Sequence, residues 1–184
     1  MIDLAEQTRL LGELPQELEV LAGAIDTVRA GEISRPVREI VPIAVRAHDL
    51  SIRCLKQLDT LAGSQYAVMK DGHENLAFVA EATVRVSLVS TLCSYGITGR
   101  TEALLYEGTD ETPETSRGYL AEANEELRQA AGTYRVLAQN LSRRLASAAA
   151  RAEDQRRIER ALARRGPAPE TPAHSPSPAS GRCR

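Results

Sequence analysis

The residues with the clearest chemical potential are eight arginines near the C-terminal end, in the segment LSRRLASAAARAEDQRRIERALARRG of residues 141–166. Only three acidic residues accompany them in this segment. A guanidinium group binds a phosphate or carboxylate group through planar pairs of N–H donors, so the segment is a candidate site for an anionic partner. The candidate partner-binding residues are Arg143, Arg144, Arg151, Arg156, Arg157, Arg160, Arg164 and Arg165.

Nucleic acid is one such partner, but the pattern is not typical of a sequence-specific reader. On a helical wheel the eight arginines spread over most of the circumference, and some have an acid one helical turn away, as Arg157 has Glu153. In basic-zipper proteins the basic region precedes the zipper, whereas here it follows the leucine-rich part. No aromatic residue for base stacking follows Tyr134. Three interpretations therefore stay open: a solvated helical extension, a contact with an acidic protein surface (including that of a second copy), and nucleic-acid binding without sequence specificity.

Other residue types that do chemistry form no recognisable site in the sequence. A di-iron helical bundle needs Glu-x-x-His on two helices, and this motif is absent from the sequence. Cys54, Cys93 and Cys183 lack the spacing of metal ligands. We therefore expect no metal, no cofactor and no catalytic residue, and a protein that is not an enzyme. A small-molecule sensor with a core pocket near His48, Tyr95 and Cys93 stays open as an alternative.

Two short stretches receive structural interpretations. His48 lies on an otherwise apolar helical stripe, which predicts a hydrogen-bonded histidine in the core or at its boundary. The segment GITGRT of residues 96–101 lacks the lysine and the longer glycine spacing of a phosphate-binding loop. Gly96 or Gly99 is therefore expected to end a helix.

Leucine-type residues recur at seven-residue steps near both ends of the folded part, which is typical of the buried seam of a helical bundle or coiled coil. Such a seam places one side of each helix against its neighbours. The first seam comprises Leu4, Leu11, Leu18 and Ile25 with Leu14, Leu21 and Val28. The last seam comprises Leu120, Leu127, Tyr134 and Leu141 with Ala123, Ala130 and Leu137.

The two middle helices are less sharply patterned. The second is expected from a Ser34 cap to Gly63, and the third is apolar nearly all round, which predicts the central position. Asp71 and Glu74 have the spacing of a capping box at the start of the third helix. The alternating run of residues 83–89 is a rival strand, but no partner strand is evident. The expected core stripe of the second helix is Val37, Val41, Ala44, His48, Leu55, Leu58 and Ala62.

These patterns predict an all-α fold: an antiparallel four-helix bundle with a long protruding C-terminal helix and a disordered tail. The domain division that follows has three parts. The expected parts are a helical bundle (1–142), an arginine-rich helical extension (143–165) and a Pro/Ser-rich tail (166–184). The expected helices lie near 2–30, 34–62, 72–98 and 113–165.

Charge and composition set the expected function. Residues from 143 onward carry ten arginines against four acids, whereas residues 1–142 carry 13 basic and 21 acidic side chains.

Glu81 and Arg85 interrupt the most apolar run, so we expect no membrane span and a cytoplasmic protein. The alanine and arginine abundance suggests a GC-rich bacterial genome. We expect an interaction or assembly protein that acts through exposed seams of its first and last helices, with a protein partner, a homodimer included.

Overall fold

The regular secondary structure is entirely helical in the part of the chain that the computed structural model describes, residues 3–108 and 111–164. Residues 83–89, the rival strand, are helical. Arg165 and the expected tail lie outside the described residues. The elements in chain order are α1 (Leu4–Ala30), α2 (Pro36–Ala62), the 3₁₀-helix η1 (Gln65–Val68), α3 (Gly72–Glu102), the π-helical turn η2 (Ala103–Glu107), α4 (Glu114–Ala146) and α5 (Ala148–Arg164).

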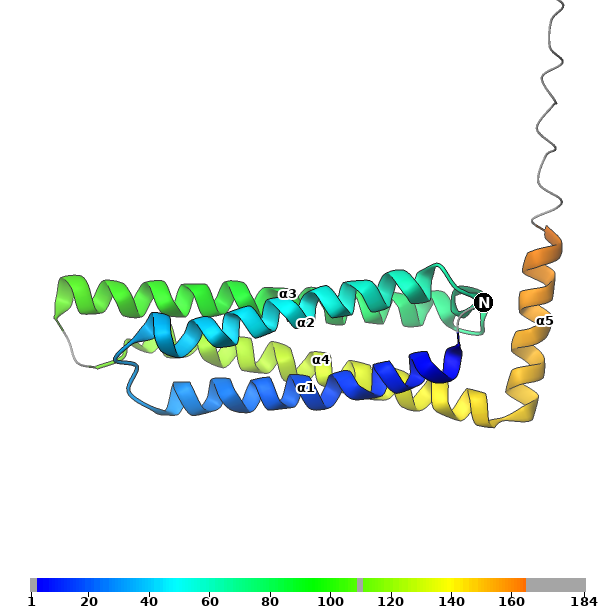
Figure 1. The fold of residues 1–184 in the computed structure, drawn as a ribbon, viewed down its shortest axis with the longest axis horizontal. Helices are drawn as coiled ribbons and strands as arrows, with labels where there is room; N and C mark the ends of the chain where they lie inside the picture. The colour runs from blue at the N-terminus through cyan, green and yellow to red at the C-terminus, as the bar shows by residue number, and fades with distance from the viewer. Residues whose placement is uncertain (1–2, 109–110, 165–184) are drawn as a thin grey trace, which may run out of the picture.

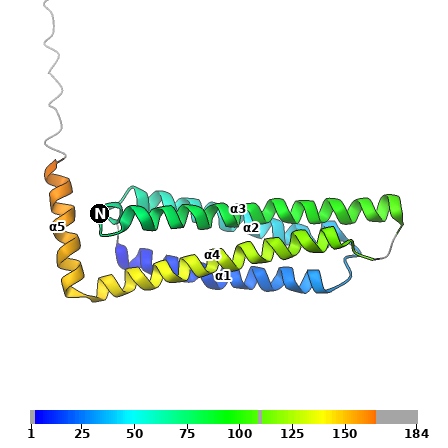
Figure 2. The same ribbon diagram turned by 180° about the vertical axis from the view of Figure 1, so that it is seen from behind.

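Helices α1 to α4 form an antiparallel four-helix bundle, which confirms the predicted fold class (Figure 1). Helix α4 packs against α1 and α3, and α2 packs against α3, while the contact between α1 and α2 is the loosest of the four. The bundle thus has one layer of α2 and α3 and another of α1 and α4, as Figure 1 and the view from behind in Figure 2 both show. The four helices are 27 to 33 residues long, or about 40 to 50 Å at 1.5 Å per residue.

The helix starts differ in part from the sequence expectations. Pro36 occupies the first turn of α2 as expected, but Arg35 rather than Ser34 is the cap residue, and its backbone N–H donates to the Glu39 carboxylate at 2.9 Å. The expected capping box at α3 is wrong, because Asp71 adopts a left-handed conformation with φ 60° and its side chain caps nothing. A compact turn after η1 requires this conformation, which Asp tolerates better than most residues.

The expected helix end at Gly96 or Gly99 is also wrong. Helix α3 continues through both glycines to Glu102 and runs directly into η2, which Gly108 ends with φ 63°. A Cβ atom on Gly99 would lie 3.0 Å from the hydroxyl oxygen of Ser116, and one on Gly96 would lie 3.5 Å from Leu120. The two glycines therefore let α3 approach α4 closely.

The seams predicted for the first and last helices are confirmed as core. Leu11, Leu18 and Ile25 of α1 and Leu120 and Leu127 of α4 are fully buried. Burial of both seams inside one bundle corrects the expectation that they are exposed for a partner. Any apolar interaction surface must lie elsewhere.

The stripe expected to be the core side of α2 is wrong. Val37, Val41 and Leu55 are 60%, 37% and 52% exposed, and His48 is exposed between them. Ala44 and Leu58 of the same stripe are only partly buried. The side of α2 that enters the core carries Ile40, Ile43, Ala47, Leu50, Cys54 and Leu61. Helix α2 is apolar on two sides, and periodicity alone does not tell which side meets the bundle.

Helix α3 is not central either. Its Val86 and Val89 are fully buried, but Val84 is 67% exposed and Tyr95 is 53% exposed. Every helix of a four-helix bundle keeps an outer side, so a helix that is apolar all round leaves apolar side chains at the surface. The segment Gly72–Glu107 has the length and composition of a membrane span, which by itself is weak evidence.

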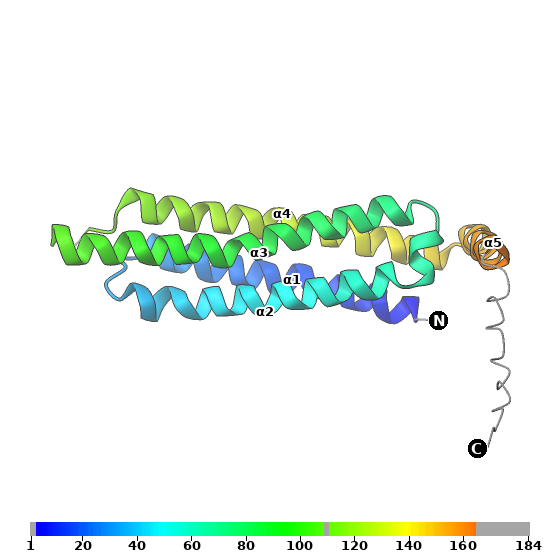
Figure 3. The same ribbon diagram turned by 90° about the horizontal axis from the view of Figure 1, so that it is seen from above.

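The long helix expected over 113–165 is two helices. Ser147 has an extended backbone with ψ 118°, which ends α4, and α5 then turns across the end of the bundle near η1 (Figures 1 and 3). The C-terminal helix therefore contacts the bundle along part of its length before it extends past the α2 and α3 layer.

Candidate functional site

Helix α5 is fastened to the bundle by a buried carboxylate. Asp154 is 5% exposed, and its Oδ1 accepts hydrogen bonds from the backbone N–H of Lys70 at 3.0 Å and from Arg144 at 2.6 Å. Its Oδ2 accepts a third from Arg144 Nε at 3.2 Å. Arg144, a predicted partner-binding residue, is therefore engaged within the chain and positions α5.

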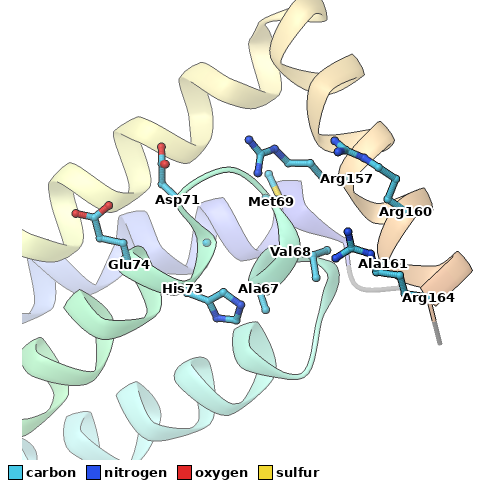
Figure 4. A pocket seen from close by; sticks show the side chains of 11 residues that line it. Ala67, Val68, Met69, Asp71, His73, Glu74, Arg157, Arg160, Ala161 and Arg164 are labelled. Atoms are coloured by element: carbon cyan, nitrogen blue, oxygen red, sulfur yellow. The ribbon is translucent and has the colours of Figure 1, made fainter.

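A cleft of about 400 Å³ opens between α5 and the junction of η1 with α3. Arg157, Arg160 and Arg164 extend from one side of α5 toward residues 67–69 and 71–74 on the opposite wall (Figure 4). The structure thus brings three of the eight predicted arginines together. We refer to this site as the arginine cleft.

The electrostatics of the arginine cleft are mixed. Arg157 is paired with Glu153 of its own helix at 3.2 Å, and its buried Nε has no hydrogen-bond partner among the described residues. Asp71 and Glu74 belong to the opposite wall, and the Glu74 carboxylate points away from the arginines (Figure 4). With Glu153 counted, three carboxylates balance the three guanidinium groups, so the cleft suits one phosphate or carboxylate group better than a long polyanion.

The remaining predicted arginines do not join the cleft. Arg143 lies exposed in the last turn of α4, and Arg151 and Arg156 lie exposed on α5, away from the cleft lining. Arg165 is outside the described residues. The arginines are therefore divided between a structural contact, a cleft and open solvent.

The residues proposed for a sensor pocket do not come together. His48 lies on the outer side of α2, and Tyr95 packs against Tyr119 with ring centroids 5.3 Å apart. Cys93 is fully buried, and burial raises the pKa of its thiol to about 11. Within the described ranges no three His, Cys, Asp or Glu side chains are grouped so as to hold a metal ion.

Arg100 is a buried cation that the sequence analysis did not single out. It is 1% exposed, and it donates to the carbonyl oxygens of Ile33 at 2.6 Å and Glu111 at 2.6 Å and to the Glu32 carboxylate at 3.3 Å. These bonds join the α1–α2 connection to the segment before α4. Because its donors serve backbone and side-chain acceptors inside the fold, Arg100 is a structural residue.

The second candidate site is a continuous apolar surface along α2 and α3, which we call the outer α2/α3 face. The two helices lie side by side over most of the bundle (Figure 3). A hydrogen bond of 2.6 Å between Ser51 and Ser87 fixes their antiparallel register. The exposed apolar members of this face are Val37, Val41, Val45, Ile52 and Leu55 of α2 and Val84, Leu88 and Tyr95 of α3.

Three hydroxyl groups on α3 next to this face are already satisfied, whereas the buried hydroxyl of Thr101 at its end has no hydrogen-bond partner among the described residues. The hydroxyl groups of Ser87, Ser94 and Thr98 donate to carbonyl oxygens one turn earlier in α3, at 2.9, 2.9 and 3.1 Å. Arg85 turns toward α4, where it binds Glu126 at 2.9 Å. Another apolar surface can therefore cover these three hydroxyl groups and Arg85 without leaving a hydrogen-bond donor unpaired.

One end of the face is hollowed. An open cavity of about 550 Å³ is lined by Val37, Thr101, Leu104 and Leu105 together with residues 35, 36 and 38. Val37 and Thr101 are opposite each other in the register that Ser51 and Ser87 define, so α2 and α3 keep this register to the end of the bundle.

Comparison with protein-family models, with curated proteins and with solved structures found no match. The arginine cleft and the outer α2/α3 face are thus the two features of the described chain on which a function can be based. They differ in chemistry, since one is a small arginine-lined site and the other is a long apolar surface.

Proposed function

We propose that this chain is a non-enzymatic assembly protein that docks a helical protein partner on its outer α2/α3 face. The observation that carries the proposal is the second apolar stripe of α2, which adjoins the apolar outer side of α3. Soluble monomers rarely expose long apolar patches, and a large one marks an interaction surface. A cytoplasmic location is part of the same proposal.

The energetics favour a partner of this kind. Burial of a fully exposed Val, Leu or Ile side chain stabilises a complex by about 1.5 to 3 kcal/mol. Val37, Val45, Leu55 and Val84 are each more than half exposed, so their burial can offset much of the cost of association, which is about 4 to 15 kcal/mol. The three- and four-residue steps of this face match the apolar stripe of another helix.

In-cell photo-crosslinking tests the proposal. A photoreactive amino acid replaces Val45 on the face, and in a matched control it replaces Val136, which is 55% exposed on α4. We expect a discrete protein adduct from position 45 and none from position 136. Equal labelling at both positions, or none at either, would overturn the proposed function.

A second candidate function rests on the arginine cleft. Three guanidinium groups line the arginine cleft, where they can bind a phosphate group, and a nucleic-acid backbone is one source of that group. Such binding would be sequence-independent, and log affinity would fall with log salt with a slope of no more than about 3, because at most three phosphates are neutralised. A salt titration with bulk DNA tests this, and the combined Arg157→Gln, Arg160→Gln and Arg164→Gln variant should abolish the signal.

A further inference from the structure

We infer that the occupant of the outer α2/α3 face is a second copy of this chain, related by a two-fold axis parallel to the helices, so that α2 of each copy covers α3 of the other. This inference rests on the proposed function, because it names the partner of the same face. An isologous two-fold contact of one face with itself is the commonest form of a soluble oligomer. The charges at the edges of the face provide the argument for this occupant.

The two long edges of the face differ in charge, although the α2 edge also holds one exposed acid, Asp49. Arg38 and Lys56 lie on α2, and Glu81 and Glu102 lie on α3. All four side chains are exposed, and Arg38, Lys56 and Glu102 have no ion-pair partner among the residues that the structure describes. Glu81 is paired with Arg85 at 2.8 Å. Charges at the rim of an apolar face mainly set the orientation of the partner.

The antiparallel register places these charges at matching heights. Because Ser51 lies opposite Ser87, Arg38 lies at about the height of Glu102, and Lys56 lies at about the height of Glu81. A two-fold axis parallel to the helices keeps every residue at its own height while it exchanges the two edges. Arg38 of each copy then meets Glu102 of the other, and Lys56 meets Glu81.

The middle of the face brings apolar side chains together in the same arrangement, apart from exposed His48 and Asp49 of α2. Ile52 of one copy lies at about the height of Leu88 of the other, and Val45 lies at about the height of Tyr95. The alternative two-fold axis, which runs across the helices through the centre of the face, would set Arg38 against Lys56 and Glu81 against Glu102. Juxtaposed like charges disfavour that arrangement.

The dimensions of the face reach the lower limit for a dimer interface. The 18 residues between Arg38 and Lys56 span roughly 27 Å, and two neighbouring helices are roughly 20 Å wide. The two copies together then bury about 1,000 Å² or more, which is the lower limit expected for a biological interface. A membrane surface is the less favourable occupant, because anionic headgroups attract Arg38 and Lys56 but repel Glu81 and Glu102, whereas the dimer gives each of these charges an opposite partner.

Helix α5 rises past the α2 and α3 layer at one end of the face (Figure 1). In the proposed dimer both α5 helices lie at this same end.

Sedimentation velocity of the purified full chain tests the inference. We expect a dimer at about 10 μM, and we expect Val45→Asp to raise the dissociation constant at least about tenfold. Val136→Asp is the matched control, because it adds the same charge at the same exposure on α4 and should leave the dimer intact. Circular dichroism confirms that both variants are folded.

Charge reversal tests the direction of the axis. Arg38→Glu alone should weaken the dimer, and Arg38→Glu combined with Glu102→Arg should restore it. A monomeric wild-type chain, a dimer that Val45→Asp leaves unchanged, or co-flotation of the monomer with anionic lipid vesicles would overturn the inference. A photo-crosslinked adduct of position 45 with a different protein would overturn the second copy but leave the proposed function standing.

Discussion

Asp154 on α5 accepts a hydrogen bond of 3.0 Å from the backbone N–H of Lys70, 84 residues earlier in the chain. This bond and the ion pair with Arg144 place an acid of the arginine-rich segment in the protein interior. The position of α5 across the end of the bundle, and with it one wall of the arginine cleft, depends on this one carboxylate.

Replacement of Asp154 by alanine should therefore release α5. The change leaves Arg144 and the Lys70 N–H without their acceptor, and the loss of such buried hydrogen bonds costs about 1 to 3 kcal/mol. Hydrogen exchange should quicken in α5 and at residue 70 while the α1 and α4 core stays protected. Glu159→Ala, on the exposed side of α5, is the control and should change neither; unchanged exchange in the Asp154 variant would contradict the anchoring role.

Gly72 at the start of α3 should tolerate no side chain. A Cβ atom there would lie 2.2 Å from the carbonyl oxygen of Tyr66 and 2.8 Å from that of Ala67, and both are backbone atoms that move only if the turn moves. Gly72→Ala should lower the free energy of unfolding by about 1 to 3 kcal/mol, as overpacking does.

Gly12→Ala provides the contrast to Gly72→Ala. No atom lies within 4 Å of a Cβ at Gly12, so alanine should stabilise α1 by up to about 1 kcal/mol through its helix propensity. Urea denaturation of both variants measures the difference. Equal stability of the two variants would show that the backbone of the η1–α3 turn can move to make room for a Cβ atom at Gly72.

Two valines of α3, two residues apart, should respond in opposite ways to the same change. Val86 is fully buried, so Val86→Asp places an unpaired charge in the core and should cost several kcal/mol. Val84 is 67% exposed, so Val84→Asp should change the free energy of unfolding by about 0.5 kcal/mol or less. Denaturation at low protein concentration, where a dimer dissociates, measures this difference; a large loss for Val84→Asp would contradict its outward position.

The parts of the fold that could be predicted are the helices whose apolar residues lie on one side only, because only that side can enter the core. Leu11, Leu18, Leu120 and Leu127 recur at strict sevens on helices with a single apolar side, so their burial follows from the sequence. Helix α2 has two apolar sides, and the choice between Ile40 and Val37 depends on which neighbour covers it. That choice is made by tertiary packing, which periodicity does not encode.

The arginine cleft was only partly predictable for a related reason. The arginines are visible in the sequence, but Asp154 looks like a solvated acid between exposed residues. Its burial depends on the break at Ser147, which has no proline or glycine to mark it, and on a backbone N–H in a distant turn. The outer α2/α3 face carried a signal that could have been used: α2 holds more apolar residues than one core stripe needs.

The last prediction concerns stability in alkali. Burial raises the pKa of the Cys93 thiol from 9.0 to about 11, so the folded state favours the neutral thiol. A raised pKa contributes stability that is fully present below pH 9 and is lost as the pH rises toward 11. The largest loss that this shift allows is about 2 to 3 kcal/mol.

Cys93→Ala removes the titrating group, so its free energy of unfolding should fall less steeply between pH 9 and pH 11 than that of the wild type, although the cavity lowers its value at neutral pH. Val89→Ala, which also makes a cavity in α3 but removes no titrating group, is the control and should keep the wild-type slope. Parallel curves for Cys93→Ala and wild type would show that the alkaline loss arises elsewhere, with Tyr134 the next candidate, because burial also raises the pKa of its hydroxyl.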